Sequence, residues 1–203
     1  IATQQTGFSF VAQMRSWLPN EIGGILWFGV DDAAQNVYYP VYCGNTQVPE
    51  EMAVDNGDLL TFSWTSAFWI HNWVSNMVYS RYKDMIKDVQ KLQNTLEAGF
   101  RNNQPKVEKE AQNLYEKKKT DAVNYLTNYT NSIIKDGVAQ WKKLGEYLLV
   151  KYMDGVIKKE ENGVFKRNPY GKPTSPNRSG YPEDHYRRII KETGNRYKVI
   201  PIN

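Results

Sequence analysis

Residues 8–44 constrain the fold of this chain most, because strand-like apolar segments alternate there with turn signals. Along residues 8–15 apolar and mostly polar side chains alternate, which is typical of a strand with one buried face. Residues 25–30 form a nearly continuous apolar run, which predicts a strand covered on both faces. Residues 36–42 return as a further strand, and Pro40 places it at a sheet edge or puts a bulge in it. The last two segments are expected to pair as a hairpin in a small antiparallel sheet.

Helical spacing dominates the middle of the chain. Behind Ser66 or Thr65, either of which can cap a helix, apolar residues recur every three or four positions for about thirty residues. Gly99 and then Pro105 predict the end of that helix. Short connections join it to two further predicted helices, which are expected to pack as antiparallel neighbours, at about residues 107–131 and 132–152.

The composition changes again toward the C-terminus, where Pro, Gly, Ser and Asn gather after Gly163. One short helix is predicted near residue 183, because Pro182 suits a helix start. The sequence thus predicts an α+β chain with a small antiparallel sheet plus long packed helices. Its three parts are antiparallel strands in residues 1–63, a helical layer or hairpin of three long helices in residues 64–160, and a Pro/Gly-rich tail with one short helix in residues 161–203.

The overall composition fits a packed protein and argues against several classes of partner. The 203 residues suffice for one domain or one and a fraction, and 40% of them are hydrophobic. The net charge is only +4 and both signs mix along the helical half, which argues against a nucleic-acid partner. No apolar run approaches the ~20 residues that span a bilayer, so no membrane span is expected. The single cysteine excludes an intrachain disulfide and a multi-cysteine metal site, but it leaves the compartment open.

Three candidate groups are interpreted as structural. Cys43 needs a base to act as a nucleophile, and neither His71 nor His185 is its sequence neighbour, so the thiol is predicted to be a small hydrophobe ending a strand. Asp31 and Asp32 are predicted to serve a turn, because adjacent residues of an extended segment point to opposite faces. His71 lies among aromatic residues and is predicted to be a satisfied core histidine. No cluster of His, Asp and Glu has the spacing of metal ligands, so neither a metal nor another cofactor is expected.

Arg15 is the better candidate for contact with a substrate. It follows the first predicted strand, where a guanidinium can hold a substrate carboxylate through two parallel hydrogen bonds or brace an active-site acid. The alternative is a structural arginine stacked on Trp17 or Trp27. Both interpretations stay open at this point.

Four segments of the sequence resemble one enzyme family, namely QMRSWLP, IGGILWFGVDDA, VYYPVYCG and SAFWIHNWVSNMVYSRY. They are similar to the cysteine dipeptidases of the N-terminal nucleophile hydrolase class, and the resemblance covers roughly the first three quarters of the chain. It implies a four-layer αββα sandwich, in which two antiparallel sheets lie between helical layers. It also implies hydrolysis of short peptides, chiefly dipeptides, without a metal.

The resemblance further implies that the nucleophile is a cysteine at the mature N-terminus. The α-amine of that cysteine would act as the general base for its thiol. This chain begins with Ile1. We therefore expect it to be the C-terminal part of such an enzyme, with no catalytic residue of its own and no activity when isolated. Its partners would be short peptide substrates and the N-terminal portion of the same protein. A cut fragment and a naturally processed second chain are both compatible with this expectation.

A non-enzymatic module is the competing hypothesis. In it, the helices of residues 66–152 form a docking surface and the small sheet supports them. That hypothesis predicts polar sheet edges and a folded monomer. The enzyme-portion hypothesis predicts instead an apolar sheet face that is left uncovered, or self-association into a homo-oligomer that covers it.

Overall fold

The computed structural model of the protein describes residues 2–178, 180–199 and 201. The chain divides into two compact units, Ile1–Leu149 and Val150–Asn203. The elements are those of an α+β protein with a small antiparallel sheet and long helices, which confirms the predicted class at this level.

The sheet of the first unit consists of three antiparallel strands in the order β1-β2-β3. Their bounds are Phe8–Gln13 for β1, Ile25–Val30 for β2 and Tyr39–Tyr42 for β3. Phe10 pairs with Phe28 of β2, and Leu26 pairs with Val41 of β3. The predicted hairpin is therefore confirmed, and Pro40 indeed lies in an edge strand, where its missing N–H costs no ladder bond. Two short helical segments belong to this part of the chain, α1 at Asn20–Gly23 and η1 at Glu50–Met52.

Three helices follow the strands, and their breaks differ from the predicted ones. They are α2 at Ala67–Ser80, α3 at Tyr82–Lys117 and α4 at Lys119–Tyr152. The helix α3 continues through both Gly99 and Pro105, and the breaks fall instead at Arg81 and Lys118, which have non-helical backbone angles. A proline inside a helix costs about 3 kcal/mol. Burial of Phe100 and Val107 on either side of Pro105 offsets that cost, at roughly 1.5–3 kcal/mol for each large apolar side chain.

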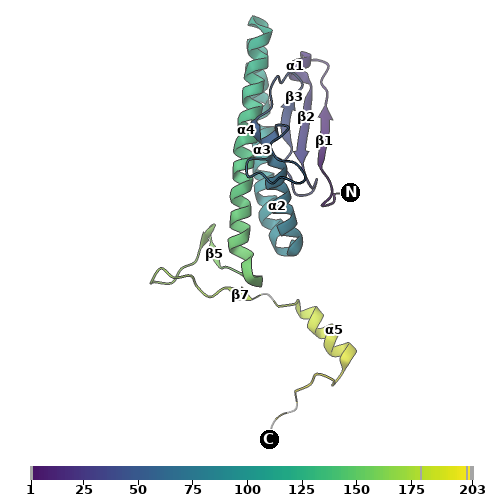
Figure 1. Cartoon of the computed structure of the whole chain (residues 1–203), viewed down its shortest axis with the longest axis vertical. Helices are drawn as coiled ribbons and strands as arrows, with labels where there is room; N and C mark the ends of the chain where they lie inside the picture. Colours follow the sequence, from purple (N-terminus) through teal and green to yellow (C-terminus); the bar gives the residue numbers. More distant parts are fainter. Residues whose placement is uncertain (1, 179, 200, 202–203) are drawn as a thin grey trace. The chain divides into compact units, whose positions relative to one another are not determined.

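The core of the first unit lies between one face of the sheet and the two long helices. Ile25 and Tyr42 from the sheet pack with Val107 and Ala111 of α3 and with Leu126 of α4. Figure 1 shows the three strands side by side, with β1 at the edge away from α4. The helices therefore cover the sheet face that carries Ile25 and Tyr42.

The other face of the sheet, which we call the outer face, is apolar and only partly covered. It carries Phe8, Phe10, Leu26, Phe28 and Val41, which occupy opposite or diagonal positions in the strand register. Phe8 and Phe10 are 59% and 54% exposed. The buried face that alternation predicts for residues 8–15 is thus wrong in this chain, because the helices pack on the opposite side.

The second unit contains short strands and one helix. The strand β4 (Val156–Ile157) pairs with β7 (Asn177–Arg178), and β5 (Glu160–Glu161) pairs with β6 (Val164–Phe165). A turn of 3-10 helix, η2 at Met153–Gly155, precedes them. The helix α5 runs over Glu183–Thr193, so the short helix predicted after Pro182 is confirmed.

Two helical glycines offer a matched test of how closely α4 packs on α2. A Cβ on Gly145 of α4 would overlap the ring of Trp73 on α2, whereas a Cβ on Gly99 of α3 would meet open space. Gly99→Ala is expected to raise the free energy of unfolding by about 1 kcal/mol, because alanine loses less entropy in a helix. Gly145→Ala is expected to lower it by on the order of 1–3 kcal/mol through overpacking. Urea denaturation of both variants measures the difference, and equal stabilisation by both would contradict the close approach.

Candidate functional site

The guanidinium of Arg15 is held by a buried carboxylate. Its Nη1 and Nη2 donate to the two oxygens of Glu108 at 2.6 and 2.7 Å, and both side chains are only 10% exposed. Nε donates to the carbonyl of Gly23 and Nη2 also donates to that of Ile22, at 3.2 and 2.9 Å. These bonds occupy four of the five N–H donors of a guanidinium. Arg15 thus joins the segment after β1 to the middle of α3.

Glu108 has further donors around it, which make this pair part of a network. Gln104 Nε2 donates to it at 2.8 Å and the hydroxyl of Tyr42 donates at 3.4 Å. Burial, together with the negative charge of Glu108, raises the pKa of Tyr42 well above the usual range. The Tyr42 hydroxyl therefore keeps its proton and remains a donor. Sequence reasoning missed Glu108, because the predicted helix break at Pro105 separated it from any apolar pattern near the sheet.

Cys43 lies one residue beyond β3 and shares a cavity with Arg15. This cavity, which we call the Arg15 cavity, measures about 400 Å³ and is lined by Met14, Arg15, Ser16, Asn20, Gly23, Gly24 and Cys43. Cys43 is exposed and forms no disulfide. Within the part of the chain that the structure describes, the thiol forms no hydrogen bond, and His71 is buried inside the first unit. His71 is therefore not available to Cys43 as a base.

Asp31 and Asp32 are buried and fasten the end of β2 to α2. Asp31, whose backbone has a φ of 66°, accepts hydrogen bonds from Asn72 Nδ2 at 2.9 Å and from Ser75 Oγ at 2.5 Å. Asp32 accepts one from the hydroxyl of Tyr79 at 2.5 Å. That bond raises the pKa of Tyr79 to about 12. The three donors come from one stripe of α2, a set of contacts that the turn interpretation did not include.

The two acids have separate partners, as expected of adjacent residues that point to opposite faces. The turn itself is present, because the backbone N–H of Ala34 donates to Asp32 Oδ1 at 2.9 Å. What the sequence did not reveal is that both carboxylates are almost fully buried. Their donors on α2 replace the water that each carboxylate loses.

His71 occupies the core between α2 and α4. Its ring stacks on Trp141, with ring centroids 5.0 Å apart and planes inclined by 16°. Nδ1 lies 2.8 Å from the carbonyl of Ala67, so this nitrogen carries the proton in the neutral ring. Burial lowers the pKa of His71 to about 4. A buried core histidine is what the sequence predicted, although its Nε2 has no partner among the described residues.

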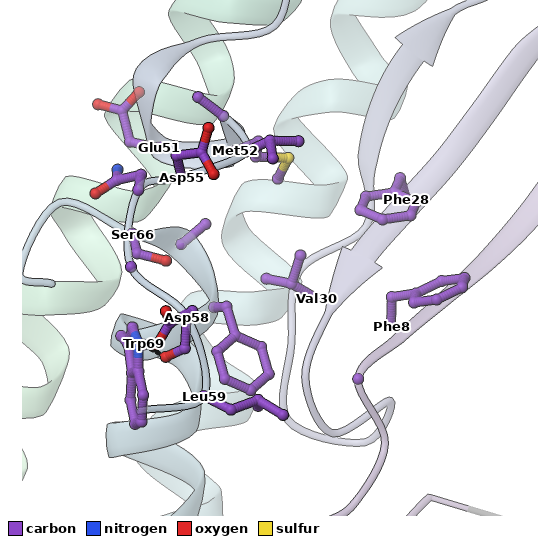
Figure 2. A pocket seen from close by; sticks show the side chains of 17 residues that line it. Phe8, Phe28, Val30, Glu51, Met52, Asp55, Asp58, Leu59, Ser66 and Trp69 are labelled. Carbon is purple, nitrogen blue, oxygen red and sulfur yellow. Dashed lines mark hydrogen bonds between the residues drawn. The ribbon is translucent and has the colours of Figure 1, made fainter. Parts of the chain in front are cut away.

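A second cavity, which we call the acidic cavity, lies between the loop of residues 51–59, the start of α2 and the strands β1 and β2. It measures about 490 Å³. Figure 2 shows Phe8, Phe28 and Val30 on the strand side, and Met52, Leu59 and Trp69 on the loop and helix side. Glu51, Asp55 and Asp58 also line it. A concave, mostly apolar space of this size with a few polar groups is typical of small-ligand sites.

Neither cavity contains a cluster of described side chains that could bind a metal ion. Among the residues that it describes, no three His, Cys, Asp or Glu side chains are arranged to hold a metal ion. In the same described part of the chain, no helix is long and apolar enough to cross a membrane.

A comparison with protein families matches residues 1–95 to Peptidase family C69. We call residues 1–95, which are similar to this family, the C69 segment. The predicted resemblance to cysteine dipeptidases is thereby confirmed, over a segment shorter than the predicted three quarters of the chain. No curated protein matches the sequence.

The C69 segment carries both cavities and most of the residues described above. The sheet, α1, η1 and α2 lie entirely within it, and so do Arg15, Asp31, Cys43 and His71. Glu108 lies outside it, and so do α4 and the second unit. The function class that the C69 match supports is that of a peptidase, a hydrolase of peptide bonds.

Proposed function

We propose that this chain is the C-terminal portion of a cysteine dipeptidase whose nucleophilic N-terminal cysteine lies outside it. The C69 match is the observation that carries this proposal. The environment of Cys43 supports it, because this internal thiol has no free α-amine and forms no hydrogen bond with a base among the described residues. A cysteine thiol without a general base to accept its proton is a poor nucleophile at neutral pH.

In this proposal the chain completes an αββα sandwich. Residues 1–63 contribute antiparallel strands, residues 64–160 contribute a helical layer, and residues 161–203 form a tail with one short helix. The exposed part of the outer face supports this assignment, since aligned sheets pack face to face through apolar side chains. A second sheet from the N-terminal portion would cover Phe8 and Phe10. The docking-module hypothesis predicts polar edges, and the exposed phenylalanines of the edge strand β1 do not favour it.

The proposed reaction is acyl transfer through a thioester. The cysteine thiol gives its proton to its own α-amine, and its sulfur forms a bond to the peptide carbonyl carbon. The protonated amine then gives that proton to the departing amino group as the C–N bond breaks. Water hydrolyses the thioester, which releases the second product and restores the thiol.

Arg15 is the residue of this chain that we propose for contact with substrate. A dipeptide presents a carboxylate, and the fifth N–H of Arg15, on Nη1, has no partner among the described residues. Because Arg15 lines the Arg15 cavity, one charge-assisted hydrogen bond to that carboxylate is available without breaking the pair with Glu108.

Recombining the two portions of the protein tests the proposal. The N-terminal portion encoded by the same gene is mixed with this chain, and dipeptide hydrolysis is measured with and without a thiol-alkylating reagent. We expect no hydrolysis by this chain alone, hydrolysis by the mixture, and a loss on the order of a thousandfold on alkylation.

Cys43→Ala in this chain is the matched control. The mixture that contains it should stay active and remain sensitive to alkylation. An inert complex, or portions that do not associate, would contradict the dipeptidase proposal. Hydrolysis by this chain alone that Cys43→Ala abolishes would place the nucleophile at Cys43 instead.

A further inference from the structure

The loop that forms one wall of the acidic cavity is fixed by its own hydrogen bonds. Trp69 Nε1 donates to the carbonyls of Asp58 and Thr61 at 3.1 and 2.9 Å. Asn56 Nδ2 donates to the carbonyl of Glu50 at 2.8 Å, and Asn56 Oδ1 accepts from Ser63 Oγ at 2.7 Å. The cavity is thus formed before any ligand arrives, which reduces the ordering cost of binding.

The charged groups at this cavity are all negative. Glu51, Asp55 and Asp58 line it, and no described lining residue is basic. The carboxylates of Glu51 and Asp55 have no hydrogen-bond or ion-pair partner among the described residues. Asp58 accepts a hydrogen bond from the backbone N–H of Leu60 at 2.7 Å, and this bond lowers its pKa. Like charges around one cavity repel each other, and a bound cation relieves that repulsion.

Two of the three carboxylates lie at one end of the cavity, and Asp58 lies apart from them beside Leu59 and Trp69 (Figure 2). In Figure 2, Glu51 and Asp55 lie together with Met52 at one end, whereas Phe8 and Phe28 lie on the strand side. A ligand that fills this space therefore needs an apolar body and a cationic group at one end. An inorganic cation would leave the apolar wall unused, and an anion would meet only like charge.

We propose that the acidic cavity binds the first residue of a short peptide, with the protonated α-amine against Asp55 and Glu51 and an apolar side chain against Phe28 and Val30. Arg15 and this cavity lie at opposite ends of β1, so one dipeptide does not contact both, and the cavity is an alternative to Arg15 as the place of substrate contact. The identification of the ligand as a peptide rests on the proposed dipeptidase function. The affinity for an apolar amine rests only on the geometry and charge of the cavity. An α-amine has a pKa of about 7.7–8.0, so it is protonated at neutral pH and below.

Titration of the 203-residue chain with the dipeptide Phe-Gly tests this inference, with the indole N–H signal of Trp69 in a ¹H–¹⁵N spectrum as the readout. We expect a saturable shift with a dissociation constant in about the millimolar range. N-acetyl-Phe-Gly, which lacks the charge, should bind on the order of tenfold more weakly. Gly-Gly, which lacks the side chain, should be weakened to a similar degree. Affinity for Phe-Gly should fall as the pH rises above about 8, because the amine loses its proton.

Charge-neutralising variants test whether the α-amine of the peptide contacts Glu51 and Asp55. Glu51→Gln and Asp55→Asn should each weaken Phe-Gly binding by roughly threefold to tenfold. Glu50→Gln is the matched control, since Glu50 is the adjacent carboxylate but does not line the cavity. It should leave the affinity unchanged. Equal binding of Phe-Gly and its acetylated form, or equal losses from Glu50→Gln and Glu51→Gln, would overturn the inference.

The mixture with the N-terminal portion separates this inference from the proposed function. If the mixture hydrolyses Phe-Gly and Glu51→Gln with Asp55→Asn leaves kcat/KM unchanged, the cavity proposal fails and the dipeptidase proposal stands. If Phe-Gly binds the chain but the mixture hydrolyses nothing, the dipeptidase proposal fails and the amine site stands. Loss of Phe-Gly binding on addition of the N-terminal portion would show that a protein segment fills the cavity, which also overturns the inference.

Discussion

Replacing Arg15 by alanine is expected to lower the free energy of unfolding by about 3–5 kcal/mol, because it leaves the Glu108 carboxylate buried without its cation. Both side chains are 10% exposed, so solvent screens this pair little. Gln104 and Tyr42 would still donate to Glu108, but two neutral donors do not replace a bidentate guanidinium. Urea denaturation of the chain followed by tryptophan fluorescence measures the loss. A loss below about 1 kcal/mol would show that the pair behaves as an exposed one.

The double variant Arg15→Met with Glu108→Leu separates stability from substrate contact. Replacing both members of a buried pair by apolar residues of similar volume is often neutral or stabilising, so most of the lost stability should return. If Arg15 also binds the substrate carboxylate, the mixture with the N-terminal portion should show a KM on the order of tenfold higher with this stable double variant. An unchanged KM would make Arg15 a purely structural residue.

The strand part of the fold was predictable because its signals are local. The continuous apolar run of residues 25–30 and the Pro40-containing segment after it are joined by a short turn, so their pairing needs no distant partner. The exposure of Phe8 and Phe10 was not predictable from alternation alone. Alternation shows that a strand has two different faces, but not which of them the helices of the same chain cover.

The predicted helix ends were wrong and the partner of Arg15 was missed for the same reason. Pro105 is a strong local signal for a helix end, yet the burial of Phe100 and Val107 outweighs it. With the break misplaced, Glu108 was assigned to a different helix, and nothing connected it to Arg15 across 93 residues of sequence. A single acidic residue at 8% exposure leaves no pattern, because its burial depends on a pairing that only the tertiary structure creates.

The first unit is expected to lose about 3 kcal/mol of stability from His71 as the pH falls from about 6.5 to about 4. Burial holds the pKa of the folded state at about 4, below the value of 6.5 in the unfolded chain. The unfolded state therefore binds the proton more readily across this range. The contribution of neutral His71 is complete above about pH 6.5 and declines below it. Protonation would place an uncompensated charge between the core groups of α2 and Trp141 of α4.

His71→Phe isolates this contribution, because phenylalanine keeps an aromatic ring against Trp141 and does not titrate. Carboxylates also titrate in acid, so the informative quantity is the difference in unfolding free energy between the two proteins at each pH. That difference should change by about 3 kcal/mol in favour of the variant between pH 6.5 and pH 4.

Replacing the other histidine by His185→Phe should leave the pH dependence of the first unit as it is in the unmodified chain. Parallel curves for the unmodified chain and His71→Phe would mean that His71 takes up a proton without unfolding the core. The histidine side-chain signals in an NMR pH titration decide between these outcomes, because burial of His71 predicts a midpoint near 4 for its ring.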